Sequence, residues 1–120
     1  PAHLLRLSQT ALTYAEAAAR SGSVTDEAYQ WLNKIRTRAG LSTYSGLSRE
    51  DFIKAVVDER KWEFAGENVR WYDILRLELE DEVFAGKDNN YDPGNLHPAG
   101  DKDYTFPIPA TETLVNPNLK

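Results

Sequence analysis

The chain has 120 residues, and its 19 acidic residues outnumber its 14 basic ones to give a net charge of -5 at neutral pH. This length predicts one domain with one modest core, and an acidic chain without a Lys/Arg block is not typical of proteins that bind nucleic acid or anionic membranes. The absence of cysteine excludes a disulfide framework, a thiolate nucleophile and a cysteine zinc site, and no apolar run approaches the ~20 residues that cross a bilayer.

Apolar residues at the start of the chain repeat at helical spacing. Leu5, Leu12 and Ala19 follow one another at seven-residue intervals. Spacings of three and four add further residues to the same stripe, namely Leu4, Ala11, Ala15 and Ala18. The pattern predicts an amphipathic helix from the start of this stripe to about Ser21, where Gly22 supplies a stop.

A second helix is predicted to start after Thr25. A threonine in this place serves as an N-cap, and Asp26 and Glu27 suit the positive end of a helix. The residues expected on its buried face are Ala28, Leu32, Ile35 and Ala39. Because the link is short, we expect an antiparallel hairpin that packs like a tetratricopeptide unit, although no repeat of it at a period near ~34 residues follows.

A lone hairpin leaves an apolar face uncovered, which either a later helix or something outside the chain must bury. Ser48 followed by Asp51 gives a capping pattern for a third helix. The stripe expected to pack on the hairpin contains Ile53, Val56, Val57 and Phe64. The third helix is therefore the predicted cover for the hairpin.

Two charged residues fall on or beside that stripe. Arg60 lies between Val57 and Phe64 at helical spacing, and Glu63 is next to them. A lone buried charge costs several kcal/mol, so an inward arginine needs carboxylate partners. The partners near it in sequence are Glu59, Glu63, Glu67 and Asp73, with Arg70 as a second cation. We therefore expect a structural charge network of Glu59, Arg60, Glu63, Arg70, Trp71 and Asp73.

The pattern weakens after the third helix. A tight break after Gly66 is predicted to lead into a short helix. One side of this helix is expected to contain Trp71, Ile74 and Leu75, and the other side Arg70 and Asp73. Beyond Leu79 the helical pattern stops, and 80–104 is expected to be irregular, far longer than the usual ~4 to 6 residues of a connection. One turn is expected from Ala110 or Thr111 to Asn116. The fold class is thus all-α: a tetratricopeptide-like helical hairpin, a third helix and a short helix, with a long irregular carboxy-terminal segment.

The carboxylates of the third helix raise the question of catalysis. A glycoside hydrolase uses a pair of carboxyl groups about 5 to 10 Å apart, and Glu59, Glu63 and Glu67 are candidates. Neighbouring Arg60 and Arg70 favour ionised carboxylates, the opposite of what a general acid at neutral pH requires. We therefore expect ion pairs here and no catalytic residue.

A run rich in Asp and Asn could hold calcium. The segment 88–94 has oxygen side chains at its first, third and fifth positions, as a calcium loop does. Pro93 stands where the sharp turn needs glycine, and Ala99 where a bidentate glutamate belongs. A solvated turn is the favoured interpretation, so we expect no metal site and no cofactor.

The motifs taken together are similar to those of one protein family. They are the segments 4–17 and 32–41, the residues Glu59, Arg60, Glu63, Arg70, Trp71, Tyr72, Asp73 and Arg76, the run 105–109 and the closing 116–120. In this order they resemble the carboxy-terminal portion of the SusD/RagB family, surface glycan-binding lipoproteins of bacterial nutrient-uptake systems. The chain also begins without methionine, and we expect residues 1–120 to be a single domain that forms a fragment of a larger protein.

The resemblance implies a function without catalysis. A family member is anchored by lipid in the bacterial outer membrane through an amino-terminal region, faces outward, binds an oligosaccharide and passes it to a TonB-dependent, SusC-like transporter. The expected partners are that transporter, the oligosaccharide and the rest of the parent chain, and no nucleic acid. The motif residues Arg60, Glu63, Arg70, Trp71 and Asp73 are implied to hold the third helix against the short helix, and the ligand-binding residues are unknown.

Several aromatic residues could stack on a sugar or pack within the fold: Trp31, Tyr44, Trp62, Tyr91 and Tyr104. Most are expected to pack in the core or at its edge. Trp62 lies beside Asp58 and Lys61 towards the polar side, which favours a contact surface. We expect that surface to meet the rest of the parent protein.

Two other classes of function stay open. One is a helical-repeat scaffold that binds a protein partner, and the other is a carbohydrate-active enzyme that uses paired carboxylates. For the enzyme, Glu63→Gln should abolish turnover and leave the fold intact. The structural interpretation predicts instead a loss of stability of a few kcal/mol, because Arg60 would be left poorly paired.

Overall fold

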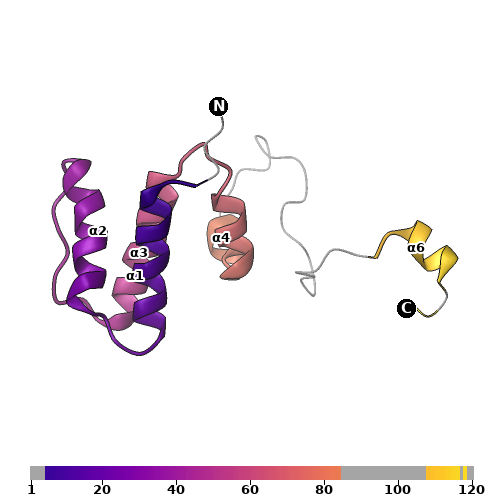
Figure 1. The fold of residues 1–120 in the computed structure, drawn as a ribbon, viewed down its shortest axis with the longest axis horizontal. Helices are drawn as coiled ribbons and strands as arrows, with labels where there is room; N and C mark the ends of the chain where they lie inside the picture. Colours follow the sequence, from indigo (N-terminus) through magenta and orange to yellow (C-terminus); the bar gives the residue numbers. More distant parts are fainter. Residues whose placement is uncertain (1–4, 85–107, 117, 119–120) are drawn as a thin grey trace. The chain divides into compact units, whose positions relative to one another are not determined.

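The computed structural model describes residues 5–84, 108–116 and 118, and all regular structure in them is helical. The helices in chain order are α1 (Leu7–Arg20), α2 (Asp26–Arg38), α3 (Arg49–Glu63), α4 (Arg70–Arg76), α5 (Glu80–Phe84) and α6 (Ala110–Val115) (Figure 1). The predicted all-α class is confirmed. In these described ranges no helix has the length and apolar character needed to span a membrane.

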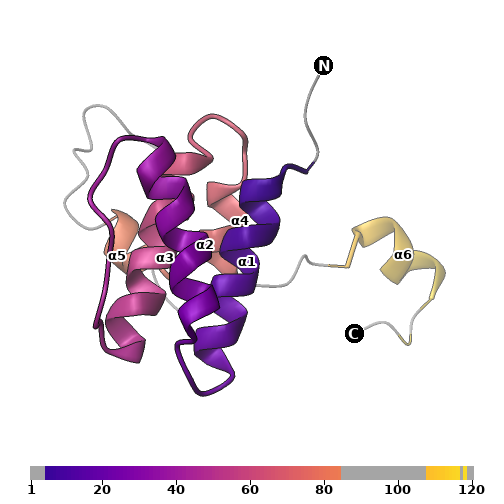
Figure 2. The ribbon, with the colours of Figure 1, turned by 60° about the vertical axis from the view of Figure 1, so that its left-hand side comes forward.

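The chain divides into two compact units, Pro1–Asp73 and Ile74–Lys120. In the first unit α1, α2 and α3 lie side by side, with α1 and α2 antiparallel and α3 packed chiefly on α1 (Figures 1 and 2). Their shared core consists of Ala11, Leu12, Ala15, Ala19, Ala28, Leu32, Ile35, Phe52, Ala55, Val56 and Phe64. The predicted hairpin and its covering third helix are therefore confirmed, and the small alanine side chains let α1 approach its neighbours closely.

Both predicted caps are present. The Thr25 hydroxyl accepts a hydrogen bond from the Ala28 amide at 3.1 Å, before a first turn that contains Asp26. The Ser48 hydroxyl accepts from the Asp51 amide at 3.1 Å and donates to the Asp51 carboxylate at 2.7 Å. These contacts fix where α2 and α3 begin.

Two expectations about the buried faces, at Leu5 and Ala39, were wrong at the helix ends. The first helix begins at Leu7, and Arg6 is extended, so Leu5 lies before the helix and is 75% exposed. A seven-residue spacing places a side chain only while the backbone is helical. Ala39 is likewise exposed because it follows the last turn of α2, and Arg36 takes the buried position instead.

The buried face of α3 differs from the predicted stripe by about one position. Ile53 and Val57 are only half-buried, whereas Phe52 is fully buried and meets Tyr29 edge to face with ring centroids 4.7 Å apart. The buried residues follow the helical series Phe52, Ala55, Val56, Glu59 and Arg60. The predicted burial of Val56, Phe64 and Arg60 is confirmed. Phe52, Ala55 and Glu59 are the core residues that the predicted stripe left out.

In the second unit a short helix occupies part of the segment that was expected to be irregular. α5 begins at Glu80, and its first turn also contains Asp81 and Glu82, which suit a helix N-terminus. Glu80 and Phe84 are both buried, four residues apart. The remainder of that segment, 85–104, lies outside the described residues, as does the calcium-like run. The turn predicted from Ala110 is confirmed as α6, which ends before Asn116.

Candidate functional site

The most buried ion pair joins α3 to the start of α4. Arg60 donates from Nε to Asp73 Oδ2 at 2.9 Å and from Nη2 to Oδ1 at 3.1 Å, and the two side chains are only 6% and 2% exposed. The third guanidinium nitrogen donates to the Thr13 hydroxyl of α1 at 3.2 Å. Such a two-bond fork fixes orientation as well as charge. Arg60 therefore holds α1, α3 and the first turn of α4 in one arrangement.

A second buried pair joins α2 to α3. Arg36 Nη1 donates to Glu59 Oε2 at 2.7 Å, and these side chains are 8% and 3% exposed. Arg36 Nε also donates to the Ser42 carbonyl at 2.7 Å, and its guanidinium lies 4.1 Å from the Tyr44 ring centroid. Tyr44 thus packs within the fold beneath a cation. Glu59 therefore pairs with Arg36, whereas the sequence predicted Arg60 as its partner.

Glu63 receives two cations at the carboxy-terminal end of α3. Arg6 Nη1 and Arg38 Nη2 both donate to its carboxylate, and Arg38 lies 2.6 Å from Oε2. Burial alone would raise the pKa of Glu63, but the hydrogen bonds from Arg6, Ser8 and Arg38 lower it below its usual value. The expectation that Glu63 supports Arg60 was wrong, because the Arg60 fork is already taken by Asp73.

Arg6 is shared between two carboxylates and a ring. It donates to Glu67 Oε1 from Nη2 at 2.7 Å and to the Glu63 carbonyl, and it lies 4.7 Å from the Phe64 ring centroid. The hydrogen bond to Glu67 raises the pKa of Arg6 further above its usual value. Although Arg6 precedes α1, it is thereby fastened to the end of α3.

The link between α3 and α4 contains two residues in the left-handed region. Gly66 has φ +82° and Asn68 φ +59°, and the Glu67 amide donates to the Phe64 carbonyl at 3.0 Å. Glycine adopts this region without strain, and asparagine does so more readily than most residues. The turn brings Asp73 back against α3 within ten residues of its end, which is why Arg60 can reach it.

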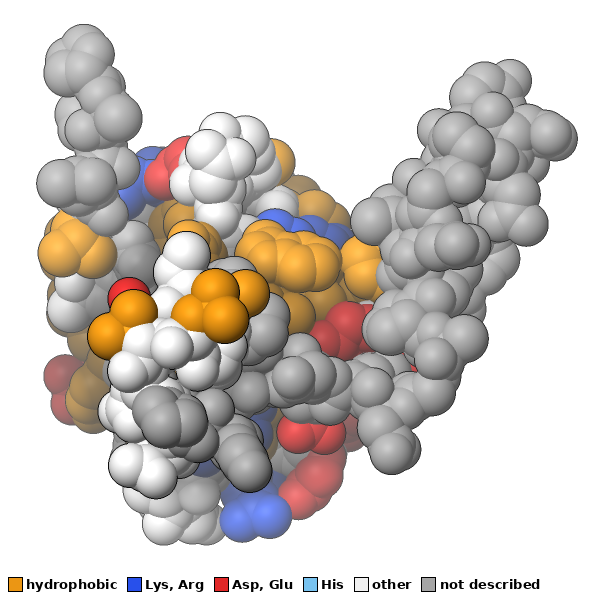
Figure 3. Space-filling view, turned by 90° about the vertical axis from the view of Figure 1, so that its right-hand side faces the viewer, with side chains coloured by type: hydrophobic (Ala, Val, Ile, Leu, Met, Phe, Trp, Pro, Cys, Tyr) orange, Lys and Arg blue, Asp and Glu red, His pale blue; other side chains and the backbone are white. Residues whose placement is uncertain are grey.

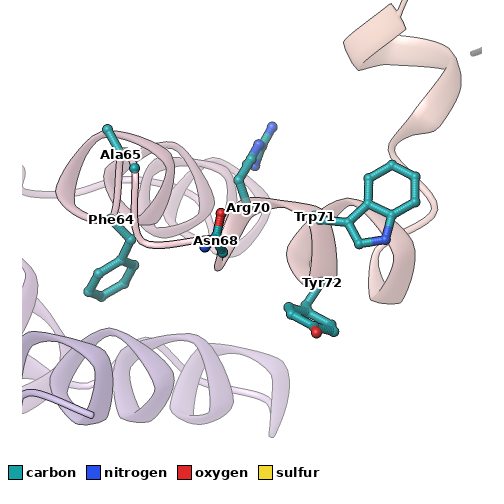
Figure 4. Close-up of a pocket in the computed structure, with 7 residues that line it drawn as sticks. Phe64, Ala65, Asn68, Arg70, Trp71 and Tyr72 are labelled. Atoms are coloured by element: carbon teal, nitrogen blue, oxygen red, sulfur yellow. The ribbon is translucent and has the colours of Figure 1, made fainter. Parts of the chain in front are cut away.

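The same turn leaves a hollow of about 470 Å³, which we call the α3–α4 hollow. Its lining consists of Phe64, Ala65, Gly66, Asn68, Arg70, Trp71 and Tyr72 (Figure 4). Trp71 is 50% and Tyr72 70% exposed, whereas Asp73 and Ile74 are buried. Trp71 was predicted to share a side with Ile74, so this expectation was wrong. The structure pairs Arg60 with Asp73 but leaves Arg70 and Trp71 outside that contact.

Other apolar side chains also reach the surface of the described part of the chain (Figure 3). Trp62 is 53% exposed with Lys61 5.1 Å from its ring centroid, and Trp31 is half-buried with Lys34 at the same distance. A smaller hollow of about 140 Å³ between α1 and α2 is lined by Leu7, Ser8, Ala11, Trp31, Lys34, Ile35 and Arg38. Tyr91 and Tyr104 lie outside the described residues.

The chemistry of the charge network is that of ion pairs. Glu59, Glu63 and Asp73 each accept hydrogen bonds from an arginine. At Glu63 these bonds lower the pKa of the carboxyl group, which opposes proton donation. Within 5–84, 108–116 and 118, no group of three or more His, Asp or Glu side chains is arranged to hold a metal ion. The arrangement joins helices through these ion pairs.

Sequence reasoning missed three arginines of this network, Arg6, Arg36 and Arg38. A signal existed for Arg36, which continues the buried series of Leu32 and Ile35 at helical spacing. Treating a charge inside an apolar stripe as a core position would have found it. Nothing local identifies Arg6, whose partner Glu63 lies 57 residues away.

The whole chain is similar in sequence to one family. The model of the SusD family matches residues 1–120. SusD-like protein P2 of Formosa agariphila is 34% identical over 127 aligned positions, which cover 96% of this chain and 24% of the relative. SusD-like protein P25 of the same organism is 38% identical, over 77% of this chain and 18% of the relative.

A SusD-like protein of Bacteroides ovatus is 33% identical over 61% of this chain and 13% of its own length. No solved structure matches the chain. The chain therefore spans at most about a quarter of the length of these curated relatives.

Proposed function

Because the chain belongs to the SusD family, we propose that it is the carboxy-terminal portion of a bacterial cell-surface protein that binds oligosaccharides without catalysis. The observation that carries the proposal is the family match over all 120 residues. The parent protein is anchored by lipid in the outer membrane and delivers its ligand to a TonB-dependent transporter. In this proposal residues 1–120 form a single domain within that larger protein.

The role of this portion is architectural. Three helices are joined by buried pairs of arginine and carboxylate, and each of these pairs connects two different helices. A binding protein gains affinity from a surface that is already formed, because less conformational entropy is lost on binding. The helices α1, α2 and α3 and the first turn of α4 thus supply a rigid support for the parent protein.

The occupied carboxylates favour binding over turnover. Glu59 and Asp73 are 3% and 2% exposed and each is engaged by a guanidinium, so neither is available to a substrate. Glu63 has a lowered pKa, which makes it a poor proton donor at neutral pH. A glycoside hydrolase would need one carboxyl group that keeps its proton there.

The test uses the full-length parent protein and a panel of defined oligosaccharides. Isothermal titration should show saturable binding of at least one of them, and chromatography after prolonged incubation should show the same oligosaccharide intact. Release of shorter products would overturn the non-catalytic part of the proposal. Absence of binding across the panel would overturn the ligand class.

Delivery to a transporter is tested separately. The parent protein carrying an affinity tag is purified from detergent-solubilised outer membranes of its own organism. We expect a TonB-dependent transporter to co-purify in a stoichiometric amount. Recovery of the tagged protein without such a transporter would contradict delivery and leave oligosaccharide binding unaffected.

A further inference from the structure

Large aromatic side chains border the α3–α4 hollow at the surface. Trp71 and Tyr72 are half or more exposed, and they project from successive positions of α4 (Figure 4). Phe64, by contrast, is buried at 2% exposure and closes the hollow from the α3 side. Exposed aromatic rings beside a concavity are typical of surfaces that another molecule covers.

Arg70 supplies a second, independent observation. Its Nη1 is shielded from solvent but has no hydrogen-bond partner among the residues that the structure describes. Arg60, Arg36 and Arg6 are each paired with a carboxylate. A shielded guanidinium nitrogen without an acceptor is unfavourable, because it has lost its hydrogen bonds to water and has formed none within the protein. The Arg70 environment is therefore incomplete.

The relatives indicate what completes it. The matched portion is 24% of SusD-like protein P2 and 18% of SusD-like protein P25, so most of a protein of that size lies outside residues 1–120. We propose that another segment of the same polypeptide covers the α3–α4 hollow, packs on Trp71 and Tyr72, and supplies a carboxylate to Arg70. This inference rests on the proposed function only in taking the chain as part of a larger SusD-family protein.

A soluble sugar is a poorer occupant of the same place. In Figure 4 the side chains of Arg70 and Tyr72 point in opposite directions, so a single sugar ring stacked on Tyr72 does not face the unsatisfied nitrogen. That nitrogen is also closed to solvent, which hinders a freely diffusing ligand but not a segment that folds with the core. A carboxylate is the favoured acceptor because the guanidinium groups of Arg6, Arg36 and Arg60 each have one.

The first experiment converts the missing contact into a covalent one. Arg70→Lys in the full-length parent places an amine near the proposed carboxylate, and a carbodiimide joins amines to carboxylates that are in direct contact. Peptide mass mapping should find Lys at position 70 joined to an Asp or Glu outside residues 1–120. Arg36→Lys is the positive control, because Arg36 lies 2.7 Å from Glu59 in a pair that is itself shielded from solvent, and it should give a link inside the chain.

With that control positive, a link from position 70 only to carboxylates within residues 1–120 would overturn the inference. So would the absence of any link from position 70. Folding of the Arg70→Lys parent is checked by its circular dichroism spectrum, and Arg70→Gln, which keeps a donor without the charge, should lower the melting temperature of the parent.

The second experiment measures solvent access to the aromatic rings. Hydroxyl-radical footprinting of the monomeric parent should oxidise Trp71 and Tyr72 as slowly, relative to the unfolded protein, as the fully buried Phe52. Oxidation at the rate of a half-exposed ring would overturn the inference. Protection that arises only on dimerisation, only with oligosaccharide or only with the transporter would assign the hollow to that partner and overturn it equally.

The two proposals fail on different readouts. If no oligosaccharide binds, the proposed ligand class is lost but a link from position 70 to another part of the parent still stands. If oligosaccharide binds and the rings stay open to radicals, the function stands and this contact does not.

Discussion

Arg60 keeps its charge in the core because Asp73 meets two of its donors. We expect Asp73→Asn to destabilise the full-length protein by about 3 to 5 kcal/mol, since it leaves a buried guanidinium without a counter-charge. Denaturant unfolding measures the loss. The matched control is Asp58→Asn, whose partner Lys61 is 42% exposed and whose removal should cost no more than about 1 kcal/mol. Equal effects of the two substitutions would contradict the assignment.

Glu63 is a test of the corrected pairing. Glu63→Gln removes the charge partner of Arg6 and Arg38, whose side chains are 28% and 63% exposed and can therefore be partly hydrated. The expected loss is about 1 to 2 kcal/mol, smaller than that for Asp73→Asn. In a double-mutant cycle Glu63 should couple to Arg6 and not to Arg60. Coupling to Arg60 would restore the pairing that the sequence predicted.

The contribution of Glu63 to stability should depend on pH. Its pKa is lower in the folded protein than in the unfolded chain, where a glutamate titrates near about 4.3. Its contribution to stability is therefore complete above that unfolded pKa and is lost as the pH falls through the lower, folded pKa. The difference in unfolding free energy between the wild type and Glu63→Gln should stay constant from pH 7 to about pH 5 and shrink below it. A difference that grows on acidification would have the wrong sign.

At the scale of single helices, the caps carry a measurable part of the stability. Thr25→Ala removes the acceptor for the Ala28 amide and should cost about 1 kcal/mol. Thr25→Ser keeps a hydroxyl in the same place and should cost much less. The test compares the melting temperatures of the two variants with that of the wild type. Equal losses would show that the Thr25 hydroxyl does not provide the stabilisation.

Local signals in the sequence were sufficient for the hairpin and its caps. Thr25, Ser48 and the alanines of α1 act through neighbours a few residues away, so pattern reasoning reaches them. The buried face of α3 was placed about one position away because Glu59 occupies a core position that hydropathy assigns to solvent, whereas the inward position of Arg60 was predicted. α5 was missed because its first turn is acidic, a composition that is also typical of polar loops, and the sequence alone does not show that Glu80 and Phe84 are buried.

The partners within the charge network lay beyond local reasoning. Arg36 and Glu59 are 23 residues apart and meet only because α2 and α3 pack side by side. Asp73 was among the candidates for Arg60 because the turn through Gly66 is short, whereas Arg6 was not a candidate for any carboxylate. Which charges are neutralised can be foreseen from the need for pairing, but the choice of partner is set by tertiary packing.

At the scale of the first unit, the ion pairs should make three helices open together. Amide hydrogen exchange of the full-length protein should give the core amides of α1, α2 and α3 similar opening free energies, because Arg60 and Arg36 connect all three. Asp73→Asn should lower these values together. A change confined to amides near Asp73 would show that the helices open independently.

The distances along the chain between paired charges also set an order of events during synthesis. Arg36 is made 23 residues before Glu59, and Arg6 57 residues before Glu63, so the α1–α2 hairpin emerges from the ribosome before the carboxylate partners of these two arginines. Closing loops of this length must wait for the later segment, and a nascent hairpin that cannot bury its arginines stays loosely formed. The packing of α3 thus completes these ion pairs, and the α1–α2 hairpin stays pliable until α3 has been translated.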